Sequence, residues 1–370
     1  MFWRTAGINW RDKGLPEHLD LNQVERLLIL KISSMGDIVH ASPVAVALKR
    51  AFPHLRIGWV VEDRHAGVLG GSPAIDRLHV IPYKQLKSFA PQRRSWWQAL
   101  LGLSKEIRAE RYQVALDLQG LLKSAIWGVL GGVPVRLGAH RMREGTWLLM
   151  KRLPIPDRPD QHVVLQYLEA ARWLGAEPLP VEFPLFIPAE AYQSVQAKLA
   201  ALGVEGAYIS INPSAGREWK RWHLARFAEL SDRIEQEWGL AVVFIGGPGD
   251  KPLEEALRTL KRRPLRSLIG QTSLKEAMAV VVHSSVHVCG DTGTAHIAAA
   301  FNIPCVGLYG PTDPDRTGPF GQREHVLYKR PLCRQCPPHR CLRHECLQWI
   351  TVDEVLNQIA RVLALEPSAL

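Results

Sequence analysis

The sequence predicts an α/β protein built from two doubly wound domains. The chain has 370 residues, which is too long for one ordinary core and suits two domains of about 150 to 200 residues each. Short runs rich in Val, Ile and Leu alternate with amphipathic stretches of helical length, which is typical of strands that feed crossover helices around a parallel sheet. A proline-rich interval divides these runs into two sets.

The expected strands are short and largely apolar. The first set comprises RLLILKI (26–32), RIGWVVE (56–62), LHVIPY (78–83), QVALDLQ (113–119) and VRLGAH (135–140). The second set comprises YISINPS (208–214), LAVVFIGG (240–247), RSLIG (266–270), VHVCGD (286–291) and PCVGLYG (304–310). Because open α/β sheets bind ligands beyond the carboxyl ends of their strands, we expect ligands there and in the cleft between the domains.

Proline density marks the connection between the domains. KRLPIPDRPD (151–160) and GAEPLPVEFPLFIP (175–188) contain too many prolines for regular secondary structure. Later in the chain, Thr351 and Glu354 have capping-box spacing and open a stretch of helical periodicity. We therefore expect an N-terminal extension (1–25), a first domain (26–185), a second domain (186–350) and a C-terminal helix (351–370).

The composition indicates a globular protein with anionic partners. Hydrophobic residues make up 46% of the chain and charged residues 22%, which excludes a disordered or coiled-coil chain. The net charge of +10 favours nucleotides, phosphorylated glycolipids, nucleic acid or an acidic membrane surface. No segment offers the ~20 uninterrupted apolar residues that cross a bilayer, and the N-terminus lacks the apolar core of a signal peptide. These features predict a cytoplasmic protein.

The first candidate site is the loop after the strand 26–32. Gly36 allows a tight turn, and Asp37 follows at the start of the next helix. The carboxylate of Asp37 is either a helix cap and nothing more or the general base of a ligand site at the strand end. His40 lies one turn further on and is a weaker candidate for the same role.

The second domain opens with a comparable loop. Ser214, Ala215 and Gly216 leave backbone N–H groups accessible, and Lys220 is placed to reach a phosphate. The alternative is that Lys220 is a surface lysine lying along neighbouring tryptophans.

The segment GDTGTAHIAAA (290–300) predicts an anion site at a helix N-terminus. Asp291, Thr292, Gly293 and Thr294 separate a strand from a helix of small residues, where N–H groups and the helix dipole favour a diphosphate. The alternative is that Thr292 or Thr294 caps a packed helix and that His296 is a satisfied polar residue. Polar residues at the end of the next strand, Thr312 and Asp313, favour the binding site.

Six motifs in this order resemble those of glycosyltransferase family 9, the lipopolysaccharide heptosyltransferases. They are KISSMGDIVHASP, LDLQGLLKSA, NPSAGREWKRW, GGPGD, GDTGTAHIAAA and YGPTDP. The resemblance implies a GT-B fold of two facing Rossmann-like domains, the first binding the acceptor and the second binding ADP-heptose. It also implies that the last helix packs back on the first domain.

The resemblance assigns roles to individual residues. Asp37 matches the catalytic base, which takes a proton from the acceptor hydroxyl as this oxygen attacks the anomeric carbon with inversion. Lys220 and the N–H groups around Thr292 and Gly293 fit the stabilisation of the departing diphosphate, without a metal ion or other cofactor. The remaining residues expected to bind substrate are Ser34, Met35, Gly36, His40, Ser214, Gly216, Asp250, Asp291, Thr294, His296, Thr312 and Asp313. The sequence departs from the family at His223, where many members have proline.

The implied partners are the donor ADP-heptose and a lipid-anchored Kdo or heptose acceptor. Such an acceptor predicts a protein peripheral to the inner face of the inner membrane, in contact with an anionic leaflet. The segment 90–112 combines Arg93, Arg94, Trp96 and Trp97 with a helical pattern, which suits such a surface or a solvated basic face with its tryptophans packed inward. A second basic group, comprising Arg141, Arg143, Lys151 and Arg152, could meet acceptor anions or could be plain surface.

A cysteine cluster lies near the C-terminus. Cys333, Cys336, Cys341 and Cys346 have the spacing C-x2-C-x4-C-x4-C, which permits a closed structural zinc site, reduced thiols or disulfides. The cluster resembles enzymes that add the second heptose, whereas SSMGDIVH is closer to those that add the first.

Two rival functions remain at the level of sequence. One is a transferase or epimerase of the same fold that uses another nucleotide sugar. The other is a zinc-stabilised nucleic-acid-binding protein, suggested by the basic charge and the cysteine cluster. The second leaves the strand-end loops unexplained, so no nucleic-acid partner is expected.

Overall fold

A computed structural model describes residues 19–87, 93–139, 141–329 and 345–364. The chain forms two compact units, and the structure places no part of one relative to the other. The first unit comprises the chain up to Pro159 together with Val163–Phe186. The second unit comprises Asp160–His162 together with the chain from Ile187 onward. Within the described ranges, no helix has the length and apolar character needed to span a membrane.

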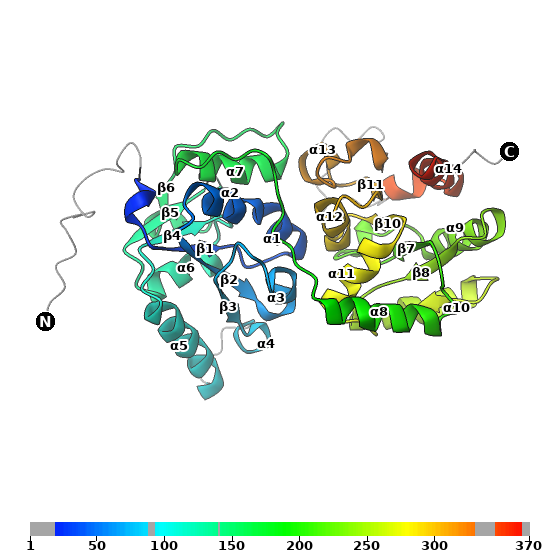
Figure 1. Ribbon diagram of the computed structural model, residues 1–370, viewed down its shortest axis with the longest axis horizontal. Coiled ribbons are helices and arrows are strands. Elements are labelled where there is room, and N and C mark those ends of the chain that lie inside the picture. Colours follow the sequence, from blue (N-terminus) through cyan, green and yellow to red (C-terminus); the bar gives the residue numbers. More distant parts are fainter. Residues whose placement is uncertain (1–18, 88–92, 140, 330–344, 365–370) are drawn as a thin grey trace, which may run out of the picture. The chain divides into compact units, whose positions relative to one another are not determined.

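The first unit is a six-stranded parallel sheet with helices on both faces (Figure 1). The strands are β1 (Arg26–Leu30), β2 (Arg56–Glu62), β3 (Arg77–Ile81), β4 (Val114–Asp117), β5 (Val135–Gly138) and β6 (Lys151–Arg152), in the order β3-β2-β1-β4-β5-β6. The helices are α1 (Met35–Ala41), α2 (Pro43–Ala51), α3 (Asp63–Leu69), α4 (Tyr83–Leu86), α5 (Arg94–Ala109), α6 (Leu122–Leu130) and α7 (Val163–Trp173). Helices α1, α2 and α7 pack together, and α5 packs with α4 and α6.

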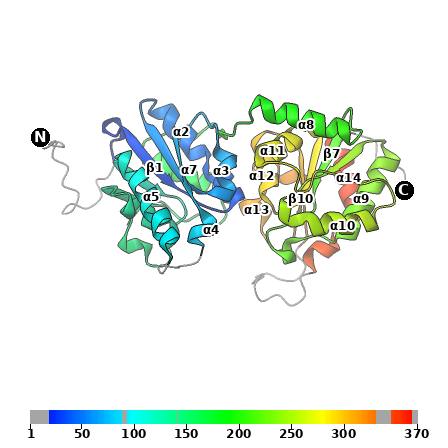
Figure 2. The same ribbon diagram turned by 90° about the horizontal axis from the view of Figure 1, so that it is seen from below.

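The second unit repeats this design (Figure 2). Its strands are β7 (Tyr208–Asn212), β8 (Ala241–Phe244), β9 (Arg266–Ser267), β10 (Val286–Gly290), β11 (Cys305–Tyr309) and β12 (Val326–Tyr328), in the order β12-β11-β10-β7-β8-β9. Its helices are α8 (Ala189–Ala201), α9 (Leu224–Glu237), α10 (Lys251–Leu260), α11 (Leu274–His283), α12 (Gly293–Ala300), α13 (Pro314–Thr317) and α14 (Val352–Leu363). Helix α11 packs with α8 and α12, and α9 packs with α10 and α14.

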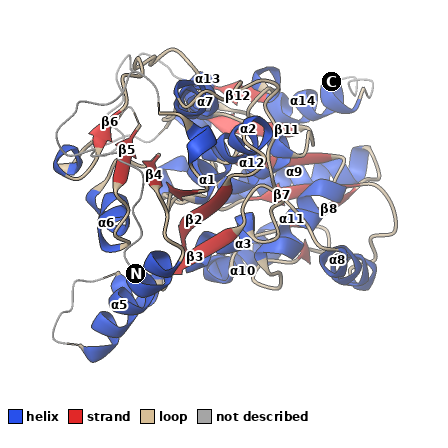
Figure 3. Ribbon diagram, turned by 60° about the vertical axis from the view of Figure 1, so that its left-hand side comes forward, coloured by secondary structure: helices blue, strands red, loops and turns tan. Residues whose placement is uncertain are grey.

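Both sheets have the same strand order when the strands are counted within each unit. The order is 3-2-1-4-5-6. In each sheet the first three strands extend to one side and the last three to the other, so the switch point lies between β1 and β4 in the first unit and between β7 and β10 in the second. Figure 3 shows the strands enclosed by helices in each unit. The prediction of two doubly wound α/β domains is confirmed.

The central strands are buried on both faces. In β1, residues Leu27, Leu28, Ile29 and Leu30 are fully buried, and the strand pairs in parallel with β2 and β4. This explains why the strand appears in the sequence as a continuous apolar run and does not alternate. The edge strands β6 and β12 were not predicted, because they are short and β6 lies inside the proline-rich segment.

The C-terminal helix α14 belongs to the second unit, and its predicted packing on the first domain stays a prediction. Its apolar residues Val352, Val355, Leu356 and Ile359 recur at helical spacing and join the core of the second unit. The helix contacts α9, β10 and β11. The predicted capping box at Thr351 is present, because the Thr351 hydroxyl accepts the N–H of Glu354 and the Glu354 carboxylate accepts the N–H of Thr351.

Candidate functional site

Asp37 lies on the first turn of α1, directly after β1. Its Oδ2 accepts a hydrogen bond from the Ser34 hydroxyl at 2.6 Å and one from the Ser34 backbone N–H at 3.2 Å. Asp37 therefore does cap the helix, yet 45% of its side chain remains exposed, so a substrate can reach the carboxylate. Met35 and Gly36 lie on the same turn and are half-buried, whereas the side chain of His40 is buried.

A buried lysine lies beside Asp37. Lys31 follows β1, and only 5% of its side chain is exposed. Its Nζ donates to the hydroxyl of Tyr167 on α7 at 2.8 Å and lies 3.8 Å from Asp37 Oδ1. Burial by itself lowers the pKa of Lys31, but the Tyr167 oxygen and the Asp37 carboxylate outweigh it, and the pKa is raised. The ammonium therefore stays charged next to the candidate base.

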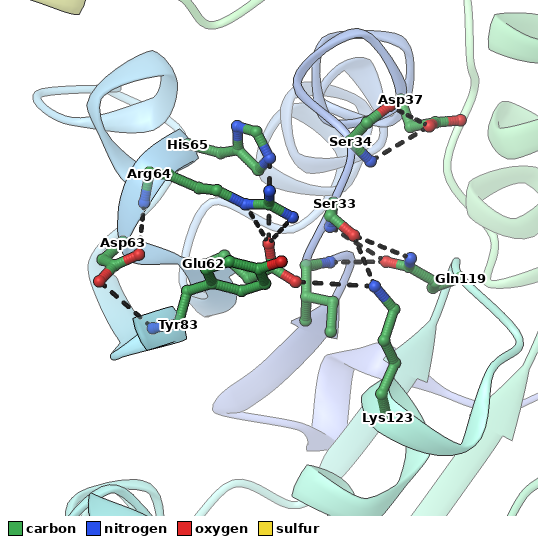
Figure 4. A network of polar contacts seen from close by, with 11 residues as sticks. Ser33, Ser34, Asp37, Glu62, Asp63, Arg64, His65, Tyr83, Gln119 and Lys123 are labelled. Carbon is green, nitrogen blue, oxygen red and sulfur yellow. Dashed lines mark hydrogen bonds and ion pairs between the residues drawn. The ribbon is translucent and has the colours of Figure 1, made fainter. Parts of the chain in front are cut away.

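A charged network follows the neighbouring strand β2 (Figure 4). Glu62 ends this strand and is buried, and its Oε2 accepts from Arg64 Nε at 2.7 Å. Its Oε1 lies 3.6 Å from Lys123 Nζ. His65 Nε2 lies 3.9 Å from Glu62 Oε2, and burial together with the nearby Arg64 cation lowers the pKa of His65. The buried carboxylate of Glu62 thus interacts with two cationic side chains, Arg64 of α3 and Lys123 of α6.

Polar contacts connect this network to the loop after β1 (Figure 4). Lys123 Nζ donates to Ser33 Oγ at 2.8 Å. Gln119 Oε1 accepts the backbone N–H of Ile32 at 2.8 Å and that of Ser33 at 3.2 Å. Asp117, which ends β4, is buried, and burial raises its pKa to about 6. The ends of β1, β2 and β4 therefore form one polar site at the switch point of the first sheet.

In the second unit, an ion pair lies at the carboxyl ends of β7 and β10. Lys220 Nζ is 2.5 Å from Asp291 Oδ2, and both side chains are mostly buried. His296 Nε2 lies 4.0 Å from the other carboxylate oxygen, Asp291 Oδ1. Gly290 precedes this carboxylate, and a Cβ there would lie 3.1 Å from the Lys220 carbonyl oxygen, so glycine permits the close approach of the loop. These elements flank the switch point of the second sheet.

The N-terminus of α12 lies at the same switch point. Thr292 is its N-cap residue, and Gly293 is its first helical residue. The first N–H groups of a helix have no acceptor within the helix, so they can bind an anion. The hydroxyl groups of Thr292 and Thr294 are 2.9 Å apart, and Asn212 Nδ2 donates to Thr294 Oγ1 at 3.2 Å.

A buried histidine supports this helix start from behind. His287 in β10 has no exposed surface. Its Nδ1 lies 2.8 Å from Ser210 Oγ, and its Nε2 lies 2.9 Å from Thr294 Oγ1. Ser210 Oγ in turn donates to Ser284 Oγ at 2.8 Å. Both ring nitrogens are thus hydrogen-bonded, which fixes the hydroxyl of Thr294 next to the N-cap.

Two predicted motifs meet on the other side of β7. Ser214 Oγ donates to Asp250 Oδ1 at 2.8 Å, and Asp250 Oδ2 accepts the N–H of Gly247 at 2.8 Å. Through these two hydrogen bonds, Asp250 links the turn that contains Gly247 to the loop after β7. Gly216 lies in that loop, and a Cβ on it would have no atom within 4 Å, so its backbone is open to a ligand.

Thr312 and Asp313 follow β11. The side chain of Asp313 accepts the N–H of Asp315 at 3.0 Å and caps α13. The hydroxyl of Thr312 is buried and has no hydrogen-bond partner among the described residues, which suits a group that completes its bonding with a ligand.

The cysteine cluster lies mostly outside the described residues. This applies to Cys333, Cys336 and Cys341, whereas Cys346 is buried in the 3-10 helix Cys346–Trp349. Within the residues that the structure describes, no three His, Cys, Asp or Glu side chains are grouped so that they could hold a metal ion. The structural zinc remains a prediction.

The sequence alone did not identify several residues of these sites, among them Lys31, Glu62, Arg64, Lys123 and His287. Lys31 lies in an apolar run that predicts a strand, and His287 lies in another such run. Glu62, Arg64 and Lys123 come from different elements and share no motif. The motif LDLQGLLKSA contains Lys123, so the sequence does carry a signal for this residue.

Comparisons with known proteins find one family and its fold. The model of the family described as glycosyltransferase family 9 (heptosyltransferase) matches residues 100–346. The chain is 29% identical over 324 residues to lipopolysaccharide heptosyltransferase 1 of Pseudomonas aeruginosa, with 85% of this chain and 87% of the relative covered. The family 9 glycosyltransferase structure from Veillonella parvula matches with a TM-score of 0.81 and 20% identity, covering 94% of this chain and 98% of that one. The E. coli heptosyltransferase WaaC, solved with ADP, matches with a TM-score of 0.69 and 24% identity, covering 91% and 99%.

Proposed function

Because the chain belongs to glycosyltransferase family 9, the heptosyltransferase family, we propose that it transfers heptose from ADP-heptose to the inner core of lipopolysaccharide. The acceptor sugar is Kdo or heptose. The observation that supports this most is the presence of polar sites at the switch points of both doubly wound sheets. One offers a carboxylate and the other offers an anion-binding helix start. The relative from Pseudomonas aeruginosa, which is named a lipopolysaccharide heptosyltransferase, supports the same substrate class.

We assign Asp37 as the general base. Two hydrogen bonds from Ser34 hold its carboxylate, and the Lys31 ammonium lies close by, while much of the carboxylate stays accessible. Asp37 takes the proton of the acceptor hydroxyl as that oxygen attacks the anomeric carbon. ADP leaves from the opposite face of the sugar, so the anomeric configuration inverts.

We assign Lys220 and the start of α12 to the donor diphosphate. The diphosphate gains negative charge as its bond to the sugar breaks, and a cation with oriented N–H groups stabilises this charge. The ion pair with Asp291 holds Lys220 in place before the donor binds. Once the diphosphate engages Lys220, Asp291 can accept hydrogen bonds from sugar hydroxyls. In this assignment the chemical step uses no metal ion and no cofactor.

A lipid-anchored acceptor places the enzyme in the cytoplasm, at the inner face of the inner membrane. The net charge of +10 favours attraction to an anionic leaflet. Helix α5 exposes Trp97 and Leu101, and Arg93 and Arg94 at its start are also exposed, whereas Trp96 is half-buried. This composition supports the predicted contact of α5 with an anionic surface.

Product analysis tests the proposed function. The purified protein is incubated with ADP-heptose and, in separate reactions, with Kdo-terminated lipid A and with its monoheptosylated form. We expect one of these acceptors to gain the mass of one heptose. Transfer from another nucleotide sugar only, or conversion of the donor to an epimer without transfer, would show that the substrate class is wrong.

A further inference from the structure

An exposed apolar pair lies on a short turn of the first unit. Trp147 and Leu148 belong to the 3-10 helix Thr146–Leu148, which precedes the edge strand β6. They expose 63% and 81% of their surface, and no other large apolar side chain in the described ranges is as exposed as either. Two adjacent side chains of this kind keep considerable apolar area in water, which is unfavourable unless a partner covers it.

Burial and backbone hydrogen bonds stabilise the turn that exposes Trp147 and Leu148. Thr146 is fully buried, and its carbonyl oxygen accepts the N–H groups of Leu149 and Met150 at 2.9 Å each. Met150 is buried in the core of the first unit. The residues on either side of Trp147 and Leu148 therefore point inward, and the apolar pair is left outside by the local geometry.

The segment before the turn is anchored to the loop after β4. Gly120 has a φ of +69°, and a Cβ on it would lie 1.9 Å from the Arg141 carbonyl oxygen, so the two backbones are in direct contact. The N–H of Arg143 donates to the Gly120 carbonyl at 2.8 Å. The Glu144 carboxylate accepts the N–H of Leu122 at 3.0 Å, so this acid is engaged with the backbone.

Basic residues flank the apolar pair in the sequence. We call the following six exposed residues the Trp147 patch: Arg141, Arg143, Trp147, Leu148, Lys151 and Arg152. Within 141–152 these four basic residues accompany one acidic residue, Glu144, and Arg141 also lies 3.7 Å from the Asp157 carboxylate. The patch thus combines a strong positive charge with an exposed aromatic and an exposed aliphatic side chain.

We propose that the Trp147 patch is a membrane-contact surface, which inserts Trp147 and Leu148 between the headgroups of an anionic bilayer. A tryptophan ring is favoured at the headgroup level, a leucine side chain enters the acyl boundary, and basic residues pair with anionic headgroups. The inference rests on the proposed function, because an enzyme with a lipid-anchored acceptor has to work at such a surface.

Charge favours a bilayer over a second copy of the chain. A two-fold contact centred on the patch would bring its four basic residues against the same four residues of the other copy. Such like charges repel, whereas an anionic lipid surface neutralises them.

Vesicle flotation tests the proposal with the full chain. Wild-type protein is mixed with phosphatidylcholine vesicles containing about a quarter phosphatidylglycerol, and with vesicles of phosphatidylcholine alone. We expect flotation with the anionic vesicles and little with the neutral ones. The double variant Trp147→Ser, Leu148→Ser should lower the partition coefficient on the order of tenfold. The double variant Arg143→Gln, Arg152→Gln should lower it about fivefold for each charge removed.

Trp349→Ser is the matched control. Trp349 is 49% exposed in the second unit, and no basic residue lies within three positions of it in the sequence, so its substitution should leave flotation unchanged. Thermal unfolding of every variant checks that the fold is intact. The proposal is overturned if the wild type does not float, if the Trp147→Ser, Leu148→Ser variant floats like the wild type, or if the patch instead mediates self-association in size-exclusion chromatography.

The vesicle assay contains neither donor nor acceptor, so its result is independent of the proposed transfer. The Trp147→Ser, Leu148→Ser variant should retain wild-type transfer to a water-soluble truncated acceptor. Absence of transfer by the wild type on every acceptor would contradict the proposed function while leaving the flotation result to decide the membrane contact.

Discussion

The ammonium of Lys31 lies close enough to Asp37 to influence its chemistry. A cation at 3.8 Å favours the ionised carboxylate, and the Tyr167 hydroxyl holds this cation in place. Lys31→Met keeps the length of the side chain and removes the charge. We expect the pH below which transfer activity falls to move upward, since a carboxylate without its cation keeps its proton to higher pH. The pH profile of kcat measures this shift.

Lys49→Met is the control for this experiment. Lys49 also forms an ion pair in the first unit, with Asp76 at 2.7 Å, and it lies on α2. Its substitution should leave the pH profile unchanged. An unshifted profile in Lys31→Met would show that Lys31 serves only to support the fold.

Lys220 is expected to act on the donor in both the ground state and the transition state. Lys220→Ala removes the cation that pairs with Asp291 and, in the proposed function, with the diphosphate. We expect the KM for ADP-heptose to rise about tenfold and kcat to fall about a hundredfold. Lys198→Ala is the comparison, because Lys198 pairs with Glu276 in the same unit. Steady-state kinetics with unchanged constants in Lys220→Ala would place it outside the diphosphate site.

At the scale of single residues, the sequence predicts which site residues lie together when they belong to one loop. Ser34, Gly36 and Asp37 are contiguous, so their shared turn follows from local backbone preferences. Glu62 and Lys123 could not be paired in this way. They meet only because β2 and β4 flank β1 in the sheet, and strand order is not encoded in local periodicity.

At the scale of elements, the start of α12 depends on a buried polar chain. His287 joins Ser210 in β7 to Thr294 in α12 through both ring nitrogens. His287→Ala leaves two buried hydroxyl groups without this partner. We expect the free energy of unfolding to fall by about 2 kcal/mol and the KM for the donor to rise, because the helix start loses its support.

Urea unfolding and donor kinetics measure both effects. His287→Gln retains a donor and an acceptor in the amide and should recover part of the stability. Full stability in His287→Ala would mean that the hydroxyl groups find other partners and that the chain of hydrogen bonds does not support α12.

The position of α14 shows what an element's sequence leaves open. Its apolar stripe and capping box predict an amphipathic helix, and the structure confirms both features. The apolar stripe does not determine which core the helix covers, because Val and Ile pack equally well on the sheet of either unit. Here the stripe completes the core of the second unit, next to α9.

At the scale of the whole molecule, alternating strand and helix patterns are enough to predict two doubly wound units. Each βα repeat is local and its crossover has a fixed hand, so strand order follows a small set of options. Asp160–His162 belongs to the second unit although the chain on both sides of it belongs to the first, and the sequence does not predict this. This segment is fixed by tertiary contacts such as the one between His162 Nε2 and the Gly318 carbonyl at 3.0 Å.

The division of labour between the units is the central claim, and Asp37→Asn tests it most directly. The donor-binding residues named above belong to the second unit, whereas Asp37 belongs to the first. Asparagine has nearly the same shape but cannot take the acceptor proton at neutral pH. Calorimetry with ADP and single-turnover transfer from ADP-heptose are measured on the same preparation. We predict wild-type affinity for ADP with transfer reduced about a thousandfold or more, and transfer at the wild-type rate would contradict the account.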